Sequence, residues 1–198
     1  MDLSALDRHT PRGAAGATRE AAVLAPVLHR NDEPYLLFTK RADHLGEHPG
    51  QMSFPGGGRE PVDGTLRDTA LREADEEIGL AAEEVDVVGR LDDITTVTDY
   101  AVRPFVATIV DREYVPDERE VAEIAVLAVD DLTDPANYES ERRETDYGSL
   151  RIHYFRVDGY TVWGATGRMV AQLLELTTDW RIPEQPDRVV DPDADVSP

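Results

Sequence analysis

The sequence predicts one α/β domain in which a mixed sheet lies between helices. Apolar, β-prone runs occur on both sides of a central segment with helical period, and a second amphipathic segment follows late in the chain. With 198 residues, of which 40% are apolar, the chain is long enough to bury a core of this kind. The sequence shows no internal repeat, so we expect no repeat architecture.

The first two strands are predicted at residues 21–30 and 34–41, where the runs AAVLAPVLHR and PYLLFTKR are rich in apolar residues. The turn-forming residues Asn31 and Asp32 lie between them, so we expect the strands to pair. A Gly- and Pro-rich loop at residues 46–64 follows.

The clearest helix is predicted at residues 65–78. Its apolar residues recur at helical spacing, namely Leu66, Ala70, Leu71, Ala74 and Ile78. Gly79 follows directly and is expected to end the helix, because glycine adopts the left-handed conformation found at helix ends.

The remaining elements complete the layers. We expect strands at residues 85–94, 103–110, 123–129 and 151–157, and a helix at residues 165–176. Residues 21–180 form the predicted domain. Residues 1–20 are expected to be a flexible N-terminal segment. Residues 183–198 form an acidic tail rich in Pro and Asp, in which we also expect no packed structure.

The charge of the chain limits its partners. The chain has 41 Asp and Glu but only 20 Lys and Arg, which gives a net charge of −21. This charge disfavours binding to nucleic-acid backbones and to anionic membranes. The absence of Cys excludes disulfides and thiolate sites. No apolar run has the length of a signal peptide or membrane span, so we expect a cytoplasmic protein. Lys40 is the single lysine, and this acidic, lysine-poor composition resembles that of haloarchaeal proteins.

Three carboxylates lie on one face of the predicted helix. Glu73, Glu76 and Glu77 stand at i, i+3 and i+4, apart from the apolar face. Clustered carboxylates suit hard divalent cations, which also bridge to phosphate oxygens. The alternative is a solvated acidic face in a protein rich in acids. The loop Phe54-Pro55-Gly56-Gly57-Gly58 leads toward the same helix and would allow a ligand to approach the backbone closely.

These residues resemble the box of the Nudix hydrolases. Gly58 and the run Arg72-Glu73-Ala74-Asp75-Glu76-Glu77-Ile78-Gly79-Leu80 match it, whereas the glutamate expected between them falls on Gly64, with Asp63 and Glu60 nearby to substitute in part. The resemblance implies an α/β/α sandwich with a central mixed sheet. It also implies that Glu73, Glu76 and Glu77 hold Mg²⁺ or Mn²⁺, that Arg72 orients a glutamate, and that a carbonyl of Gly57 or a neighbour completes the metal shell.

A second motif upstream is similar to that of the coenzyme A pyrophosphatases within the Nudix hydrolases. It comprises Leu37-Phe38-Thr39-Lys40-Arg41-Ala42, His44-Leu45, His48-Pro49-Gly50-Gln51 and Ser53-Phe54-Pro55-Gly56-Gly57. Gly46 stands where that motif carries an arginine. Pro116, Glu120-Val121, Asp134-Pro135 and Trp163-Gly164-Ala165-Thr166 also resemble this subfamily, so the similarity extends over residues 20–177.

Lys40, Arg41, His44 and His48 form the densest cationic stretch of this acidic chain. Arginine binds phosphate through two parallel hydrogen bonds and lysine as a point charge, so we expect Lys40, Arg41 and His48 to bind substrate. Arg59 is a further candidate for this role. The alternative is a strand end whose arginines cover apolar surface.

The predicted activity is therefore metal-dependent hydrolysis of a diphosphate linkage in a nucleotide, with coenzyme A or an acyl-coenzyme A as the expected substrate and phosphopantetheine and adenosine 3′,5′-bisphosphate as products. One carboxylate must take the proton of the attacking water, and both Glu73 and Glu120 remain candidates. Hydrolysis of ADP-ribose or of nucleoside triphosphates is the alternative, followed by a non-catalytic nucleotide sensor. Because Nudix enzymes are often dimers, we expect a homodimer.

Overall fold

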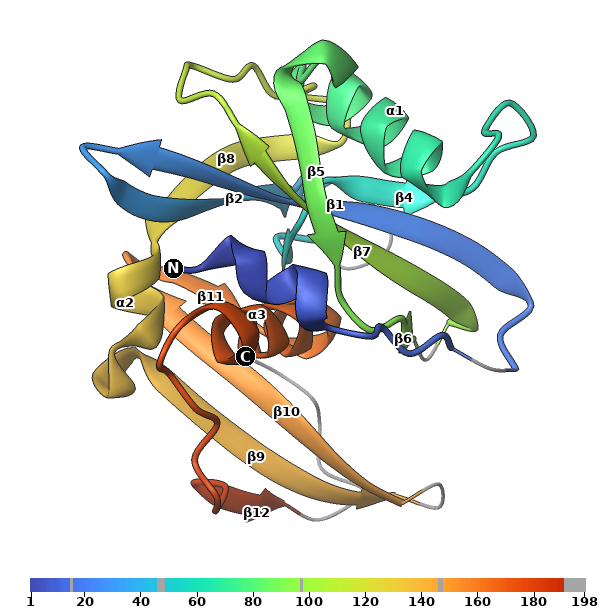
Figure 1. The fold of residues 1–198 in the computed structure, drawn as a ribbon. Helices are drawn as coiled ribbons and strands as arrows, with labels where there is room; N and C mark the ends of the chain where they lie inside the picture. Colours follow the sequence, from blue (N-terminus) through green and yellow to red (C-terminus); the bar gives the residue numbers. More distant parts are fainter. Residues whose placement is uncertain (15, 46–48, 97, 146–147, 191–198) are drawn as a thin grey trace.

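A mixed sheet of eight strands forms the centre of the molecule (Figure 1). The structure is a computed structural model that describes residues 1–190 except 15, 46–48, 97 and 146–147. The strands of this sheet are β1 (Arg19–Arg30), β2 (Glu33–Arg41), β3 (Met52–Ser53), β4 (Gly56–Gly58), β5 (Val85–Arg90), β6 (Ile94–Thr95), β7 (Tyr100–Ile109) and β8 (Val121–Ala128). The sheet is mixed because β1 runs parallel to β7 and antiparallel to β2.

The predicted pairing of the first two strands is confirmed. β1 and β2 are antiparallel, with Arg30 opposite Glu33, and the two residues between them both have positive φ, 51° at Asn31 and 67° at Asp32. Two consecutive residues of positive φ form the tight turn whose twist matches that of the flanking strands. Asn and Asp adopt this conformation more readily than other residues with a side chain.

The helix α1 (Leu66–Ile78) packs on one face of the large sheet. Its buried residues include Ala70, Ala74 and Ile78, which lie in one apolar cluster with residues of β1 and β2. The helix begins at Thr65, whose side chain accepts a hydrogen bond from Asp68 N, and ends at Gly79 with φ 63°. The predicted helix and its glycine stop are therefore confirmed.

A second layer lies on the opposite face of the large sheet. The helix α3 (Gly164–Thr177) shares the larger apolar cluster with residues of β1, β2 and a second sheet. This second sheet consists of β11 (Tyr160–Val162), β10 (Gly148–Val157), β9 (Tyr138–Thr145) and β12 (Arg188–Val190). Shorter helices are α2 (Val129–Thr133), η2 (Ala82–Glu84) and η3 (Pro135–Asn137). The predicted class, a central mixed sheet with helices packed on it, is confirmed.

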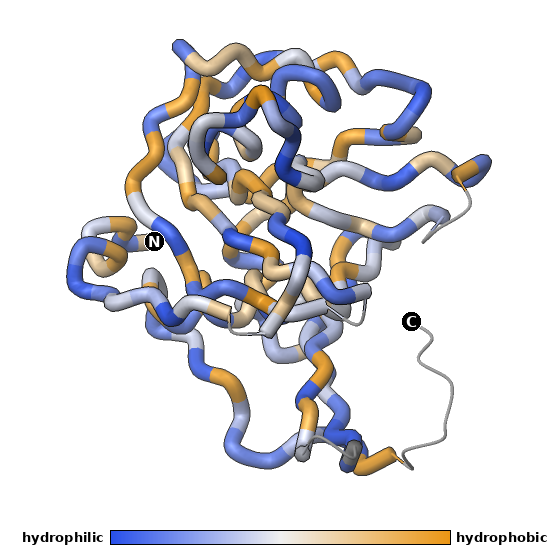
Figure 2. The backbone as a smooth tube through the Cα atoms, turned by 90° about the vertical axis from the view of Figure 1, so that its right-hand side faces the viewer, coloured by the Kyte–Doolittle hydropathy of each residue, from blue (hydrophilic) through white to orange (hydrophobic). Residues whose placement is uncertain are grey.

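The second sheet was not predicted as a separate unit. Only β10 was expected, because β9 has the sequence YESERRET, which lacks an apolar alternation. In Figure 1 the paired β9 and β10 extend away from the large sheet. Figure 2 shows hydrophobic and hydrophilic stretches interspersed along the described backbone.

Both chain ends differ from the expectation of unpacked segments. Residues Leu3–Arg8 form the helix η1, and its Leu6 is only 4% exposed because it packs against Gly89 in β5. At the other end β12 pairs with β9, and Asp187 accepts a hydrogen bond from Ser140 N at 2.8 Å. One buried apolar side chain and strand hydrogen bonds order these segments. Residues 191–198 of the predicted tail lie outside the described residues.

Candidate active site

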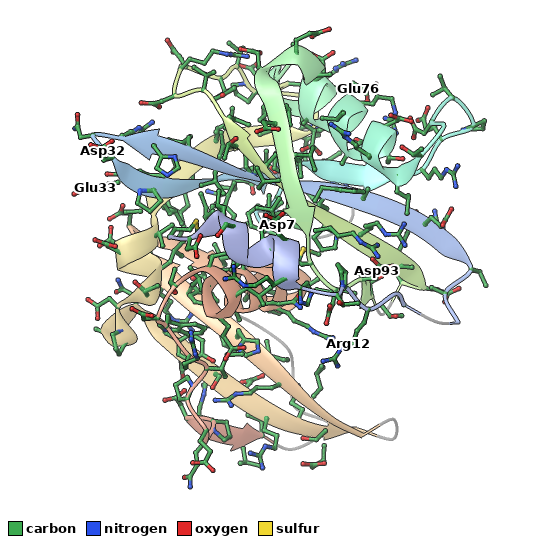
Figure 3. The ribbon with its side chains drawn as sticks, in the orientation of Figure 1. Asp7, Arg12, Asp32, Glu33, Glu76 and Asp93 are labelled. Atoms are coloured by element: carbon green, nitrogen blue, oxygen red, sulfur yellow. The ribbon has the colours of Figure 1, made fainter. Side chains whose placement is uncertain are left out.

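The three glutamates of α1 differ in their surroundings. Glu76 is the most open, with 59% of its side chain exposed, and Figure 3 shows it on α1. The side chain of Glu73 is 14% exposed. Glu77 has a buried Oε2 without a hydrogen-bond partner among the described residues. Of these three glutamates, one is therefore at the surface and two are largely withdrawn from water.

The environment of Glu77 favours its protonated form in the absence of a cation. Burial, followed by the negative charges of Glu73 and Glu120, raises the pKa of Glu77 to about 8. A hydrogen bond from the backbone of Gly56 and the positive charge of Arg41 act in the opposite direction. A carboxylate held in this way gains strongly from a bound cation, which supplies both a partner for Oε2 and a compensating charge.

Glu73 lies directly against the glycine loop. A Cβ atom on Gly57 would be 2.6 Å from Glu73 Oε1, so any other residue there would displace the carboxylate from its present position. Burial raises the pKa of Glu73, whereas the adjacent Arg72 lowers it. Gly57 and Glu73, which the sequence singled out separately, therefore lie together in the folded chain.

Arg72 connects two of the acids. Its Nη1 lies 3.0 Å from Glu73 Oε1 and 3.1 Å from Glu76 Oε2, and its Nη2 donates to the carbonyl of Gly58 at 3.1 Å. Arg72 therefore contacts two of the three glutamates of α1, and its role in orienting a glutamate stays a prediction.

Glu120 approaches the same helix from a loop. Asp117 N donates to the carbonyl of Glu77 at 2.9 Å, and Ala42 N donates to the carbonyl of Glu120 at 2.8 Å. The loop is thereby fixed between α1 and the end of β2. The exposed Glu120 lies close enough to raise the pKa of both Glu73 and Glu77.

The candidate substrate-binding residues fall into separate places. Arg41, at the end of β2, lies near Glu77, whereas Lys40 lines a cavity of about 300 Å³ together with Gln51, Tyr160 and Trp163. Lys40 Nζ is 3.8 Å from a carboxylate oxygen of Glu123. Lys40 and Arg41 are consecutive residues of β2, so the cavity and the glutamate site both lie at the end of this strand, although none of the three glutamates lines the cavity.

Arg59 does not join this group. Its Nη1 contacts Glu20 at 2.8 Å, and it lines a different cavity, together with Arg19 and Tyr100. His48 and Gly46 lie outside the described residues, so the prediction for His48 stays a prediction.

Known proteins resemble this chain in sequence and fold. The model of the NUDIX domain family matches residues 18–146. Uncharacterized Nudix hydrolase NudL of Enterobacter sp. (strain 638) is 37% identical over 159 residues, covering 78% of this chain and 81% of that protein. This chain belongs to the Nudix family.

Two further comparisons agree with that assignment. NudL of Yersinia pestis (strain Pestoides F), also named an uncharacterized Nudix hydrolase, is 33% identical over 162 residues, which are 81% of each protein. The crystal structure of a MutT/nudix family protein from Enterococcus faecalis aligns with a TM-score of 0.51 at 14% identity, covering 86% of this chain and 64% of that one, and shows the shared fold. Among the described residues of this Nudix hydrolase, no helix has the length and apolar character needed to span a bilayer.

Nudix hydrolases generally use divalent metal ions such as Mg²⁺ or Mn²⁺. No three carboxylate or imidazole groups among the described residues are already gathered for a metal, since Arg72 binds both Glu73 and Glu76. The donors nevertheless fit a hard cation, because Glu77 Oε2 lacks a partner among those residues and Glu73 faces the bare backbone of Gly57. Carboxylate and carbonyl oxygens are the ligands such cations prefer.

Two residues beside Lys40 were missed from the sequence. Glu123 lies opposite Lys40 in the pairing of β2 and β8, and Tyr160 donates a hydrogen bond to Glu123 from β11. No motif connects these positions, which are 37 residues apart. Only the register of β2 and β8, had it been known, would have placed Glu123 beside Lys40.

Proposed function

We propose that this Nudix hydrolase cleaves the diphosphate linkage of coenzyme A or an acyl-coenzyme A, yielding phosphopantetheine and adenosine 3′,5′-bisphosphate. The observation that carries the proposal is the placement of Arg41 near Glu77, with Lys40 next to it at a cavity of about 300 Å³. A diphosphate requires positive charge on the side away from the metal ligands, and the substituent beyond it requires a hollow. In this proposal Arg41 supplies the charge, and the cavity lined by Lys40, the preceding residue of β2, receives the substituent.

In this proposal each residue of the site has a separate role in hydrolysis. Glu73, Glu76 and Glu77 would hold Mg²⁺ or Mn²⁺, which when bound neutralises diphosphate charge and makes water more acidic. Arg41 holds phosphate oxygens by charge-assisted hydrogen bonds. A water oxygen attacks phosphorus, the bond from phosphorus to the bridging oxygen breaks, and the proton passes to a carboxylate.

We assign that proton to Glu120. Glu73 is engaged by Arg72 Nη1 at 3.0 Å and is one of the proposed metal ligands, so it is the less available of the two candidates for taking a proton. Glu120 is exposed and stands close to Glu73 and Glu77 without belonging to their helix. A base in this position reaches a water beside the metal ligands and can exchange its proton with solvent.

The cavity beside Lys40 suits a substituent with both polar and apolar parts. Lys40, Gln51 and Tyr160 supply polar groups, and Met52 and Trp163 supply apolar surface. Pantetheine carries amides on an aliphatic chain and matches such a mixed lining. The match supports coenzyme A over a nucleoside triphosphate, which has no such arm.

The test compares turnover of coenzyme A, dephospho-coenzyme A, ADP-ribose and ATP with Mg²⁺ or Mn²⁺, with products identified by mass spectrometry. Because the composition resembles that of haloarchaeal proteins, each assay is run in both low and molar KCl. We expect coenzyme A to have the highest kcat/KM and to yield phosphopantetheine. Preference for ADP-ribose or a nucleoside triphosphate would refute the choice of substrate, and binding without turnover of any of them would identify a sensor.

A further inference from the structure

We propose that Asp63 is the positioning residue of this site, holding Arg72, and through it the carboxylates of Glu73 and Glu76, in place of the glutamate absent at Gly64. The inference rests on the metal-dependent hydrolysis proposed above but is independent of the choice of substrate. It assigns a role to a buried acid that precedes α1 and that touches neither the substrate nor the reacting atoms.

The carboxylate of Asp63 is fully engaged. Its side chain is 3% exposed, and its two oxygens accept hydrogen bonds from Arg72 Nε and Arg72 Nη2, each at 3.0 Å. Thr69 Oγ1 donates at 3.0 Å and Glu60 N at 2.8 Å. Four donors from the loop and the helix thus converge on one charged group, which fixes its position.

The contacts of Asp63 determine the direction of the guanidinium group. A guanidinium group is planar and its five N–H donors have a fixed arrangement, so binding Nε and Nη2 also aims Nη1. Nη1 is the atom that contacts Glu73 and Glu76, at 3.0 and 3.1 Å. Without Asp63 the guanidinium group would lose two of the contacts that orient it and keep only the carbonyl of Gly58 and the two glutamates as partners among the described residues.

The geometry also explains why the acid stands one residue before the expected position. A Cβ atom on Gly64 would lie 3.1 Å from Asp68 Oδ2, and that oxygen accepts hydrogen bonds from the N–H and hydroxyl of Thr65 at the start of α1. A side chain at Gly64 would therefore crowd the carboxylate of Asp68 that caps the helix. Asp63 reaches Arg72 without this crowding.

Glu60, the other acid near the gap, provides the matched control. It is exposed, and its contact with Asp63 comes from its backbone N–H, which a side-chain substitution keeps. Glu60→Gln and Asp63→Asn remove the same charge at positions three residues apart. We expect Glu60→Gln to behave as the wild type.

The experiment measures Mn²⁺ binding to the folded protein by electron paramagnetic resonance, together with kcat and KM. In Asp63→Asn we expect about 10-fold weaker Mn²⁺ binding, the usual effect of losing a residue that orients metal ligands, and a lower kcat with little change in KM. Thermal unfolding is followed in parallel. A purely structural role would lower stability but leave Mn²⁺ affinity of the folded molecules unchanged, and that result would overturn the proposal.

A double-mutant cycle tests whether Asp63 acts through Arg72. Arg72→Met alone should weaken Mn²⁺ binding, and adding Asp63→Asn should weaken it no further. If Asp63→Asn weakens Mn²⁺ binding equally in the wild type and in Arg72→Met, Asp63 does not act through Arg72 and the proposal is overturned. The double variant removes both buried charges, which folded proteins tolerate better than the loss of one partner. If Arg72→Met does not fold, the comparison of Mn²⁺ binding between Asp63→Asn and Glu60→Gln still tests the proposal. A wild-type protein that binds Mn²⁺ but hydrolyses none of the substrates would refute only the proposed function.

Discussion

Replacing Glu77 by Gln should stabilise the metal-free protein while removing its activity. Burial raises the pKa of Glu77 from the ordinary value of 4.5, which the unfolded chain retains, to about 8 in the folded state. Between these two values the folded chain binds a proton that the unfolded chain releases, so without metal the stability contributed by Glu77 falls as the pH rises from 4.5 to 8. Gln carries no such proton and should lack this pH dependence.

The magnitude follows from the same pKa values. At pH 7 the unfolded group lies about 2.5 units above its pKa, which at about 1.36 kcal/mol per unit is about 3 kcal/mol. Part of this gain is lost because the buried amide of Gln needs hydrogen-bond partners, at a cost of about 1–3 kcal/mol, which leaves an expected gain of roughly 0.5–2 kcal/mol. For a chain of this size the midpoint of thermal unfolding should rise by roughly 2–4 °C per kcal/mol.

The assay is thermal unfolding in a chelator at pH 5, 7 and 8, repeated with Mg²⁺, alongside turnover. Glu83→Gln is the matched control, because Glu83 is exposed and lies just beyond α1. Glu77→Gln should gain stability relative to the wild type as the pH rises, lose the stabilisation by Mg²⁺, and turn over orders of magnitude more slowly. Unchanged turnover at saturating Mg²⁺, or no gain in stability without metal at pH 7, would refute the reasoning.

Three further predictions follow from the described contacts. Glu120→Gln should lower kcat by about 100-fold or more if Glu120 takes the proton, with Mn²⁺ affinity nearly unchanged; loss of Mn²⁺ binding instead would make it a ligand. Arg41→Ala should raise the KM for coenzyme A by an amount equivalent to about 1.5–3 kcal/mol in low salt and less in molar KCl, whereas an unchanged KM in low salt would contradict the phosphate contact. Burial, with the charges of nearby arginines, lowers the pKa of His153 from 6.5 to about 4, so the stability that its neutral form contributes is lost as the pH falls through that window. The wild type should therefore lose about 2 kcal/mol more stability than His153→Gln when the pH falls from 7 to 5, as measured by urea unfolding. His29→Gln, at an exposed position, is the control. Equal pH dependence in His153→Gln and His29→Gln would contradict the prediction.

The sequence by itself determined the local elements and the chemistry of one helix face. The apolar spacing of Ala70, Ala74 and Ile78 predicted α1, and Gly79 predicted its end, because helical period and left-handed glycine are properties of a few consecutive residues. The same spacing placed Glu73 and Glu77 together. The short segment η1 was missed because it carries one buried apolar side chain and no period.

Tertiary structure alone decided which distant groups surround that face. The loop contact at Asp117 brings Glu120 beside Glu77, and the pairing of β2 with β8 places Glu123 opposite Lys40. Strand register and loop path depend on how whole layers pack, so no local pattern encodes these distances. The partner of Arg72 was decided in the same way. The sequence showed an acid missing at the expected position, and only the folded loop directs the carboxylate of Asp63 onto the guanidinium group.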